Sequence, residues 1–179
     1  MKKLIFILFI SFSLGMYGQK YITKTGILNF EASTPAFEPV KAQHNTTTAI
    51  LDVSNGNVAV LALVKGFRFK NALMEEHFNE NYMESDNFPK ASFTGVIVDF
   101  KADDLGAEKE YTVKGKLTIH GETKEIETPI TLSKDGDSIT MKTSFSAAPG
   151  DFNIEIPSVV KEKISESIAI VGTFKLAPR

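Results

Sequence analysis

The three histidines, His44, His77 and His120, are the side chains best suited to acid–base chemistry or metal binding in this sequence of 179 residues. His77 and Glu80 stand three positions apart, and Glu76 and Glu80 stand four apart, so either pair would share one face of a helix. A metal site needs three or more ligands, and only the distant His44 or His120 could supply a third. The simpler interpretation is a solvated acidic helix face, and we expect no metal site.

Catalytic motifs are equally sparse. His120 directly precedes Gly121, which is typical of a turn residue, and His44 suits a polar position at a strand edge. No Gly-x-Ser-x-Gly nucleophile turn occurs, and Gly66, Gly115 and Gly121 stand alone instead of forming a phosphate-binding loop. The absence of cysteine excludes thiol chemistry, disulfides and cysteine-based metal sites. We therefore expect a protein without catalytic residues and without a cofactor.

The first 18 residues have the layout of a secretory signal peptide. Lys2 and Lys3 precede an apolar run from Leu4 to Leu14, and small residues follow. The run is shorter than the roughly 20 residues that span a bilayer, so we expect no stable membrane anchor. Cleavage near residue 18 would leave a single domain, residues 19–179, that is exported to the periplasm or secreted.

Charge bears on the class of partner. Removal of Lys2 and Lys3 with the signal peptide leaves 18 basic and 22 acidic residues, a formal net charge of −4. Proteins that bind nucleic acids favour a basic face with interleaved aromatic residues, and this sequence has no such cluster. We exclude nucleic acid as a partner.

Period-two alternation of apolar and polar residues is the main pattern of the remaining chain. In Tyr111 to Ile119 the odd-numbered positions would face one side of a strand and the even-numbered polar ones the other. Further strands are expected over residues 125–132, 138–145 and 167–176, and less regular ones near residues 21–32, 46–53, 58–69 and 92–101. Eight antiparallel strands with one apolar face each can bury that face in a sandwich or in a closed barrel, and closure also removes the sheet edges.

One short α-helix is expected around residues 71–83. Asn71 can cap its start, Leu73, Met74 and Phe78 share its apolar face, and Pro89 prevents further helix. Residues 58–64 are apolar on both faces of their strand, so we expect the helix to cover the outer face of that strand.

The interior of such a barrel has two possible states. Eight strands leave just enough room for the side chains to fill the barrel, or for a cavity that holds one small ligand. The longest irregular stretch, residues 148–164, contains Pro149-Gly150 and Pro157 and is expected to form a loop at one end of the barrel that could gate a cavity. The pattern alone favours neither state.

Two segments together resemble the YceI-like family of exported lipid-binding barrels. The first is a Phe-Pro-x-hydrophobic-x-Phe strand start that follows the helix, and the second is a Gly-x-Leu-Thr-hydrophobic-His-Gly-x-Thr-Lys run. The matching positions are Phe88, Pro89, Ala91, Phe93, Gly115, Leu117, Thr118, His120, Gly121, Thr123 and Lys124. The resemblance is specific over residues 71–132.

The resemblance implies an eight-stranded antiparallel, lipocalin-like β-barrel with a long apolar tunnel for an isoprenoid or fatty-acyl chain. It supplies no catalytic residues. Candidate wall residues of the tunnel are Phe67, Phe69, Leu73, Met74, Phe78, Phe93, Leu117, Ile119, Ile139, Met141, Phe145, Ile168, Ile170 and Phe174. Candidate polar contacts near an opening are Arg68, Lys70 and Tyr82.

We therefore expect a non-catalytic, exported carrier of a long apolar lipid. One alternative is a structural or interaction module with a filled barrel, which would work through an exposed face such as residues 75–80. A metal-dependent enzyme is the third alternative. A homodimer is compatible with any of them.

Overall fold

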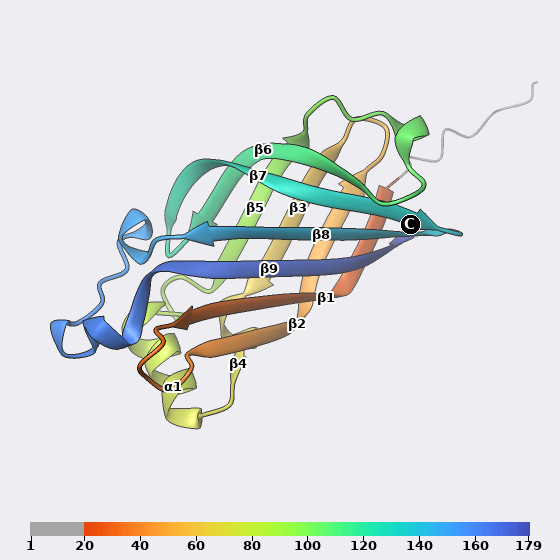
Figure 1. The fold of residues 1–179 in the computed structure, drawn as a ribbon. Coiled ribbons are helices and arrows are strands. Elements are labelled where there is room, and N and C mark those ends of the chain that lie inside the picture. Colours follow the sequence, from red (N-terminus) through yellow and green to blue (C-terminus); the bar gives the residue numbers. More distant parts are fainter. Residues whose placement is uncertain (1–19) are drawn as a thin grey trace, which may run out of the picture.

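The structure is a computed structural model that describes residues 20–179. The predicted signal peptide, residues 1–18, lies outside the described residues. Figure 1 shows the strands wrapped into one barrel, with the short helix and an irregular segment at the same end. The strands are β1 (Lys20–Ser33), β2 (Lys41–Asp52), β3 (Asn57–Leu63), β4 (Arg68–Phe69), β5 (Lys90–Ile97), β6 (Lys109–Ile119), β7 (Glu122–Asp135), β8 (Ser138–Ala147) and β9 (Ile164–Pro178). The helical segments are η1 (Val64–Gly66), α1 (Ala72–His77), η2 (Phe78–Tyr82), η3 (Ala102–Asp104), η4 (Pro149–Phe152) and η5 (Ser158–Lys163).

The sheet closes on itself. Its strands follow the order β1-β9-β8-β7-β6-β5-β3-β2, and a further ladder between β1 and β2 completes the ring. Every ladder is antiparallel, and the two-residue strand β4 pairs with β2 outside the ring. The predicted eight-stranded antiparallel barrel is confirmed, with β4 as one additional short strand.

The hairpin of β6 and β7 shows how the alternating pattern produces the barrel wall. Tyr111, Val113 and Leu117 of β6 are buried, whereas the intervening lysines face solvent. His120 and Gly121 connect the strands with φ values of +51° and +77°, the left-handed geometry that a tight two-residue hairpin turn requires. The interpretation of His120 as a turn residue is confirmed.

The predicted helix forms, in two parts. α1 is α-helical, and η2 continues it as a π-helical turn. The side-chain oxygen of Asn71 accepts a hydrogen bond from the Leu73 backbone N–H at 2.9 Å, as expected for a helix cap. Within residues 20–179 no helix combines the length and apolar character needed to cross a bilayer.

The expected position of the helix is wrong. It lies at one end of the barrel beside β4, and it does not cover β3 (Figure 1). Leu61 and Leu63 on the outer face of β3 are 37% and 54% exposed. β3 also ends at Leu63, so the segment predicted as one strand over residues 58–69 is divided by η1.

The end of the barrel away from α1 is filled by its own side chains. Leu51, Leu132, Ile139 and Leu176 point inward there and are almost completely buried, and Tyr111 joins the same cluster. This cluster, the packed half of the barrel, seals the end at which the C-terminus lies (Figure 1). The interior toward α1 is different.

Candidate ligand-binding site

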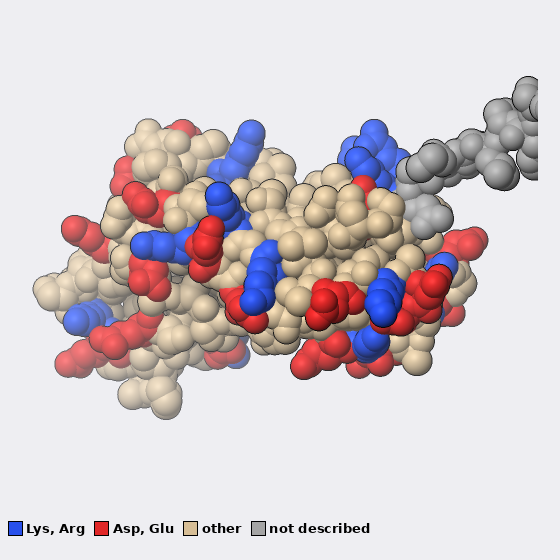
Figure 2. Space-filling view, turned by 90° about the horizontal axis from the view of Figure 1, so that it is seen from above, with Lys and Arg blue, Asp and Glu red and all other residues tan. Residues whose placement is uncertain are grey.

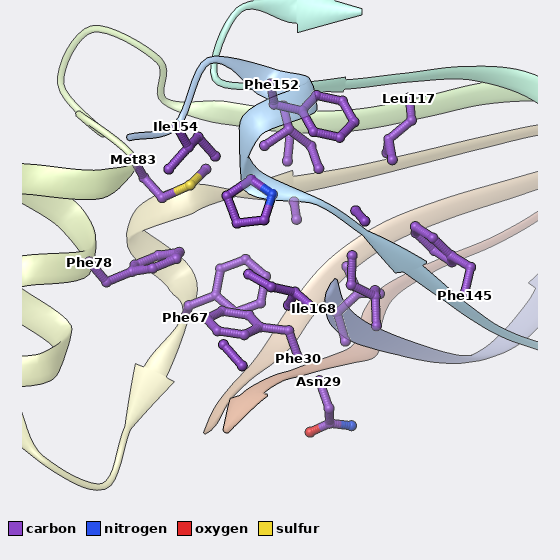
Figure 3. A pocket seen from close by; sticks show the side chains of 18 of the residues that line it. Asn29, Phe30, Phe67, Phe78, Met83, Leu117, Phe145, Phe152, Ile154 and Ile168 are labelled. Atoms are coloured by element: carbon purple, nitrogen blue, oxygen red, sulfur yellow. The ribbon is translucent and has the colours of Figure 1, made fainter. Parts of the chain in front are cut away.

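The α1 end of the barrel encloses a cavity of about 600 Å³. Inward-facing side chains of β1, β3 and β5 to β9 form its walls, and β4, α1, η2 and residues 148–164 surround its mouth. Figure 3 shows Leu117, Phe145 and Ile168 directed into this space from different strands. Most of the lining side chains are aliphatic or aromatic, and the volume lies within the range of about 300–1,000 Å³ that is usual for ligand pockets.

Most of the predicted wall residues line this cavity. Twelve of the fourteen do so, and the predicted polar contact Tyr82 does as well. The twelve are Phe67, Phe69, Met74, Phe78, Phe93, Leu117, Ile119, Met141, Phe145, Ile168, Ile170 and Phe174. That any of them contacts a ligand stays a prediction.

The other predicted positions lie elsewhere. Leu73 is on the outer side of α1, where its side chain is 57% exposed, and Ile139 belongs to the packed half of the barrel. Arg68 points outward, where its guanidinium donates to the Glu75 carboxylate at 3.0 Å. Lys70 lies with Arg68 in a polar depression outside the barrel. Neither basic side chain reaches the cavity lining.

Four phenylalanine rings, Phe30, Phe67, Phe69 and Phe78, form an aromatic cluster at the mouth of the cavity. The centroid of Phe30 lies 5.4 Å from those of both Phe67 and Phe78, and Phe69 lies 5.1 Å from Phe78. Rings at such distances attract one another beyond the effect of area burial. The cluster joins β1, β4 and η2, and Figure 3 shows Phe30, Phe67 and Phe78 beside one another. It fixes the helix to the barrel rim.

His44 packs against this cluster through Phe67. It was predicted as a polar strand-edge residue, but it is 1% exposed, and its ring packs 5.1 Å from that of Phe67. Its Nε2 donates to the Leu63 carbonyl at 3.1 Å, so the neutral ring accepts the Thr47 hydroxyl at Nδ1, 3.0 Å away. Burial, with a smaller contribution from the Arg68 charge, holds the pKa of His44 below its usual value, although the bond to Leu63 opposes this shift.

The barrel wall is split next to the cavity. The ladder between β7 and β8 ends at the pair Ile130 and Thr143, and Figure 1 shows β6 and β7 curving away from β8 beyond this point. The irregular segment of residues 148–164, expected at a barrel end, lies at this end. Phe152 of η4 is 3% exposed and contributes to the cavity lining. The segment therefore completes the wall where the ladder is missing.

The β6–β7 turn holds this segment in place. Nδ1 of His120 donates to the Phe152 carbonyl at 3.2 Å, and the His120 ring packs on Phe88 with 4.3 Å between centroids. Nδ2 of Asn153 donates to the Glu122 carboxylate at 2.8 Å. The histidine of the family motif thus connects the helix-to-strand segment, the hairpin turn and the irregular segment.

Charged groups lie almost entirely outside the barrel. Figure 2 shows acidic and basic side chains interspersed over the face seen from above. Few polar residues border the cavity, and they are Asn29, Glu38, His77, Tyr82, Ser92, Thr128, Thr143 and Lys163. Thr143 donates its hydroxyl to the Pro129 carbonyl at 2.8 Å. Within residues 20–179, no three His, Asp or Glu side chains are grouped to hold a metal ion.

Part of the cavity lining was not predicted from the sequence. Phe152, Ile154 and Ile156 line the cavity, and their alternation with Asn153 and Glu155 was a signal that could have identified them. Strands β1 and β3 contribute further lining residues that were predicted to be in strands but were not assigned to the site. These are Leu28, Phe30, Ala32, Val58, Val60 and Ala62.

Solved structures share this architecture. A polyisoprenoid-binding domain from Saccharophagus degradans, implicated in plant cell wall breakdown, aligns with a TM-score of 0.77 at 12% identity and covers 90% of this chain and 99% of its own. BcnA of Burkholderia cenocepacia aligns with a TM-score of 0.69 at 17% identity over 85% of this chain and 96% of its own. The Campylobacter jejuni YCEI protein gives 0.63 at 16% identity over 80% and 86%. These likenesses show the fold.

No curated protein matches the sequence. The model of the YceI-like domain, in contrast, matches residues 22–176, which include six of the eight barrel strands in full and most of β1 and β9. The match covers most of the chain and agrees with the motif resemblance in residues 71–132. On this evidence the chain belongs to the YceI-like domain family.

Proposed function

We propose that this protein is an exported, non-catalytic carrier that holds a long apolar lipid chain, isoprenoid or fatty-acyl, inside its barrel. The observation that carries the proposal is the cavity, whose walls are built from apolar side chains of seven strands and the aromatic cluster. The solved polyisoprenoid-binding domain with the same fold supports it. The signal-peptide pattern of residues 1–18 supports export to the periplasm or beyond.

The size of the cavity favours a long chain. A methylene group occupies about the volume of a water molecule, ~30 Å³, so 600 Å³ accommodates roughly 20 carbon atoms. Each buried methylene contributes about 0.8 kcal/mol, or about 16 kcal/mol for a chain of that length. Association costs about 4–15 kcal/mol, so a short chain would bind weakly and only a long one has a surplus.

The chemistry of the walls agrees with an apolar ligand. Burying a charged or strongly polar head without a hydrogen-bond partner is costly, and the interior offers mainly the hydroxyls of Thr128 and Thr143. The polar groups at the mouth, among them Tyr82, are better placed for a head group. We therefore expect the chain inside the barrel and the head near the rim.

Mass spectrometry of an organic extract tests the proposal. The protein is purified from its natural host without detergent, extracted with organic solvent and compared with an extract of the Ala91→Phe variant, which places a ring inside the cavity. The proposal predicts about one single-chain apolar lipid per protein for the wild type and much less for the variant. Repeated absence of lipid from the wild type would contradict it.

A further inference from the structure

Two phenylalanines form the boundary between the cavity and the packed half of the barrel. Phe174 on β9 lines the cavity and also packs with Ile139 and Leu176 beneath it. Phe93 on β5 lines the cavity and packs against the same cluster. Phe174 is 1% exposed, so its ring already lies against the packed half. These rings are the floor of the cavity.

The ring of Phe174 lies on backbone that carries no side chains. A Cβ added at Gly172 would be 2.7 Å from Cε2 of Phe174, and one added at Gly26 would be 2.4 Å from Cδ1. Both distances are far below van der Waals contact, so only glycine at these positions leaves room for the ring. The glycines therefore set how far the ring withdraws from the cavity.

Phe93 is seated in the same way on the opposite part of the wall. Gly95 and Gly115 face each other across the β5–β6 ladder, and a Cβ at either would be 2.7 Å from Cζ of Phe93. A Cβ at either glycine would also meet backbone oxygen at 2.4 Å or less, so these two glycines serve the close approach of the strands as well. The floor thus consists of two rings, each in close contact with a pair of glycines.

We infer that Phe174, seated on Gly172 and Gly26, sets the maximum length of the apolar chain that the barrel accepts, with Phe93 as the second part of the floor. The inference rests on the proposed function, because it concerns the same cavity. A chain that enters at the aromatic cluster must end at these rings, since side chains fill the space beneath them. Moving one ring changes the depth without changing the chemistry of the walls.

Substitutions at the floor shift the length limit in opposite directions. In Gly172→Ala the new methyl meets only side-chain atoms of Phe174 and Leu28, so the ring is displaced toward the cavity and the longest accepted chain becomes shorter. Phe174→Leu removes part of the ring and lengthens that chain by roughly two to four carbons, because the neighbours refill such space only partly. Phe93→Leu, at a half-buried position, provides a second deepening variant if Phe174→Leu does not fold. Gly106→Ala is the matched control, since nothing lies within 4 Å of its Cβ.

Native mass spectrometry measures the length limit. Delipidated protein is offered an equimolar series of saturated straight-chain fatty acids, from octanoic to tetracosanoic acid, and a second series of linear isoprenoid alcohols of increasing length, and the bound species are weighed. We expect a sharp upper limit for the wild type and Gly106→Ala, a lower limit for Gly172→Ala and a higher one for Phe174→Leu or Phe93→Leu. An identical limit in all variants would overturn the inference and leave the carrier function intact, whereas failure of the wild type to bind any member of either series would overturn both.

Discussion

Gly66→Ala tests how the mouth of the cavity is held. Gly66 lies in η1 directly against the His44 ring, and an added Cβ would lie 2.2 Å from Nε2 and 2.6 Å from Cδ2. His44 has little freedom to move, because Nε2 is bonded to the Leu63 carbonyl and Nδ1 to the Thr47 hydroxyl. The substitution must therefore displace the ring or η1, which carries Phe67 into the aromatic cluster.

The magnitude follows from two effects. Forcing an extra methyl into a filled site costs about 1–3 kcal/mol. Breaking the bond to the Leu63 carbonyl leaves a buried polar group without its partner, which costs about 1–3 kcal/mol. The two costs are partly alternatives, because a His44 ring that moves away from the methyl relieves the overpacking but loses its hydrogen bond. We therefore expect Gly66→Ala to lower the free energy of unfolding by about 2–4 kcal/mol.

Urea-induced unfolding of the protein measures this loss. Gly106→Ala is the control, and its free energy of unfolding should stay within about 0.5 kcal/mol of the wild type, because its Cβ points into open space. In a His44→Ala background, where the obstructing ring is gone, Gly66→Ala should lower the free energy of unfolding much less. If Gly66→Ala is as stable as Gly106→Ala, or if the losses of stability at positions 44 and 66 simply add, the His44 ring does not oppose the added methyl.

Three further predictions concern the same cavity. Burial lowers the pKa of His44, so below about pH 6.5 the unfolded chain binds more protons at this residue than the folded protein does. The free energy of unfolding should therefore fall as the pH drops below about 6.5. In His44→Gln the unfolding midpoint should depend less on pH in that window. Ala91→Phe, inside the cavity, should displace about six carbons of ligand and weaken fatty-acid binding by about 4–5 kcal/mol in a fluorescence displacement assay, whereas Thr94→Phe on the outer face of the same strand should not. His120→Ala should increase hydrogen exchange in residues 148–156 and leave β6 protected, because the bond to the Phe152 carbonyl is lost; equal exchange in both proteins would show that the bond does not hold the segment.

The strands were predictable where one face meets the interior and the other meets water. In β6 the buried Tyr111, Val113 and Leu117 alternate with exposed lysines, so residue type alone distinguishes the face toward the barrel interior from the face toward solvent. β3 has no such contrast, because the exposed Leu61 and Leu63 are as apolar as its buried residues. The sequence therefore suggested a covering helix that is not there.

The site was predictable as a set of inward-facing residues but not as a cavity. Met141 and Ile139 are two positions apart on β8, face the same way and belong to the same buried cluster, yet only Met141 also lines the cavity. Both need apolar surroundings, so residue type cannot separate a ligand wall from a core. The difference arises from which rings fill the barrel from other strands, above all Phe174.

His44 shows that residue type is equally insufficient to predict the surroundings of a polar residue. A lone histidine in a strand is compatible with an exposed edge, and only the distant Gly66 and Leu63 make its position buried and fully bonded. Such contacts between segments far apart in the chain leave no local pattern. His120 was easier, because the following Gly121 marks the hairpin turn.

A crystal structure of the protein saturated with hexadecanoic acid shows whether the barrel holds a long apolar chain. We expect one continuous, elongated feature of electron density that begins at the aromatic cluster and ends against Phe174 and Phe93. A cavity filled by water or by rearranged side chains, with the fatty acid bound elsewhere or not at all, would contradict the carrier function.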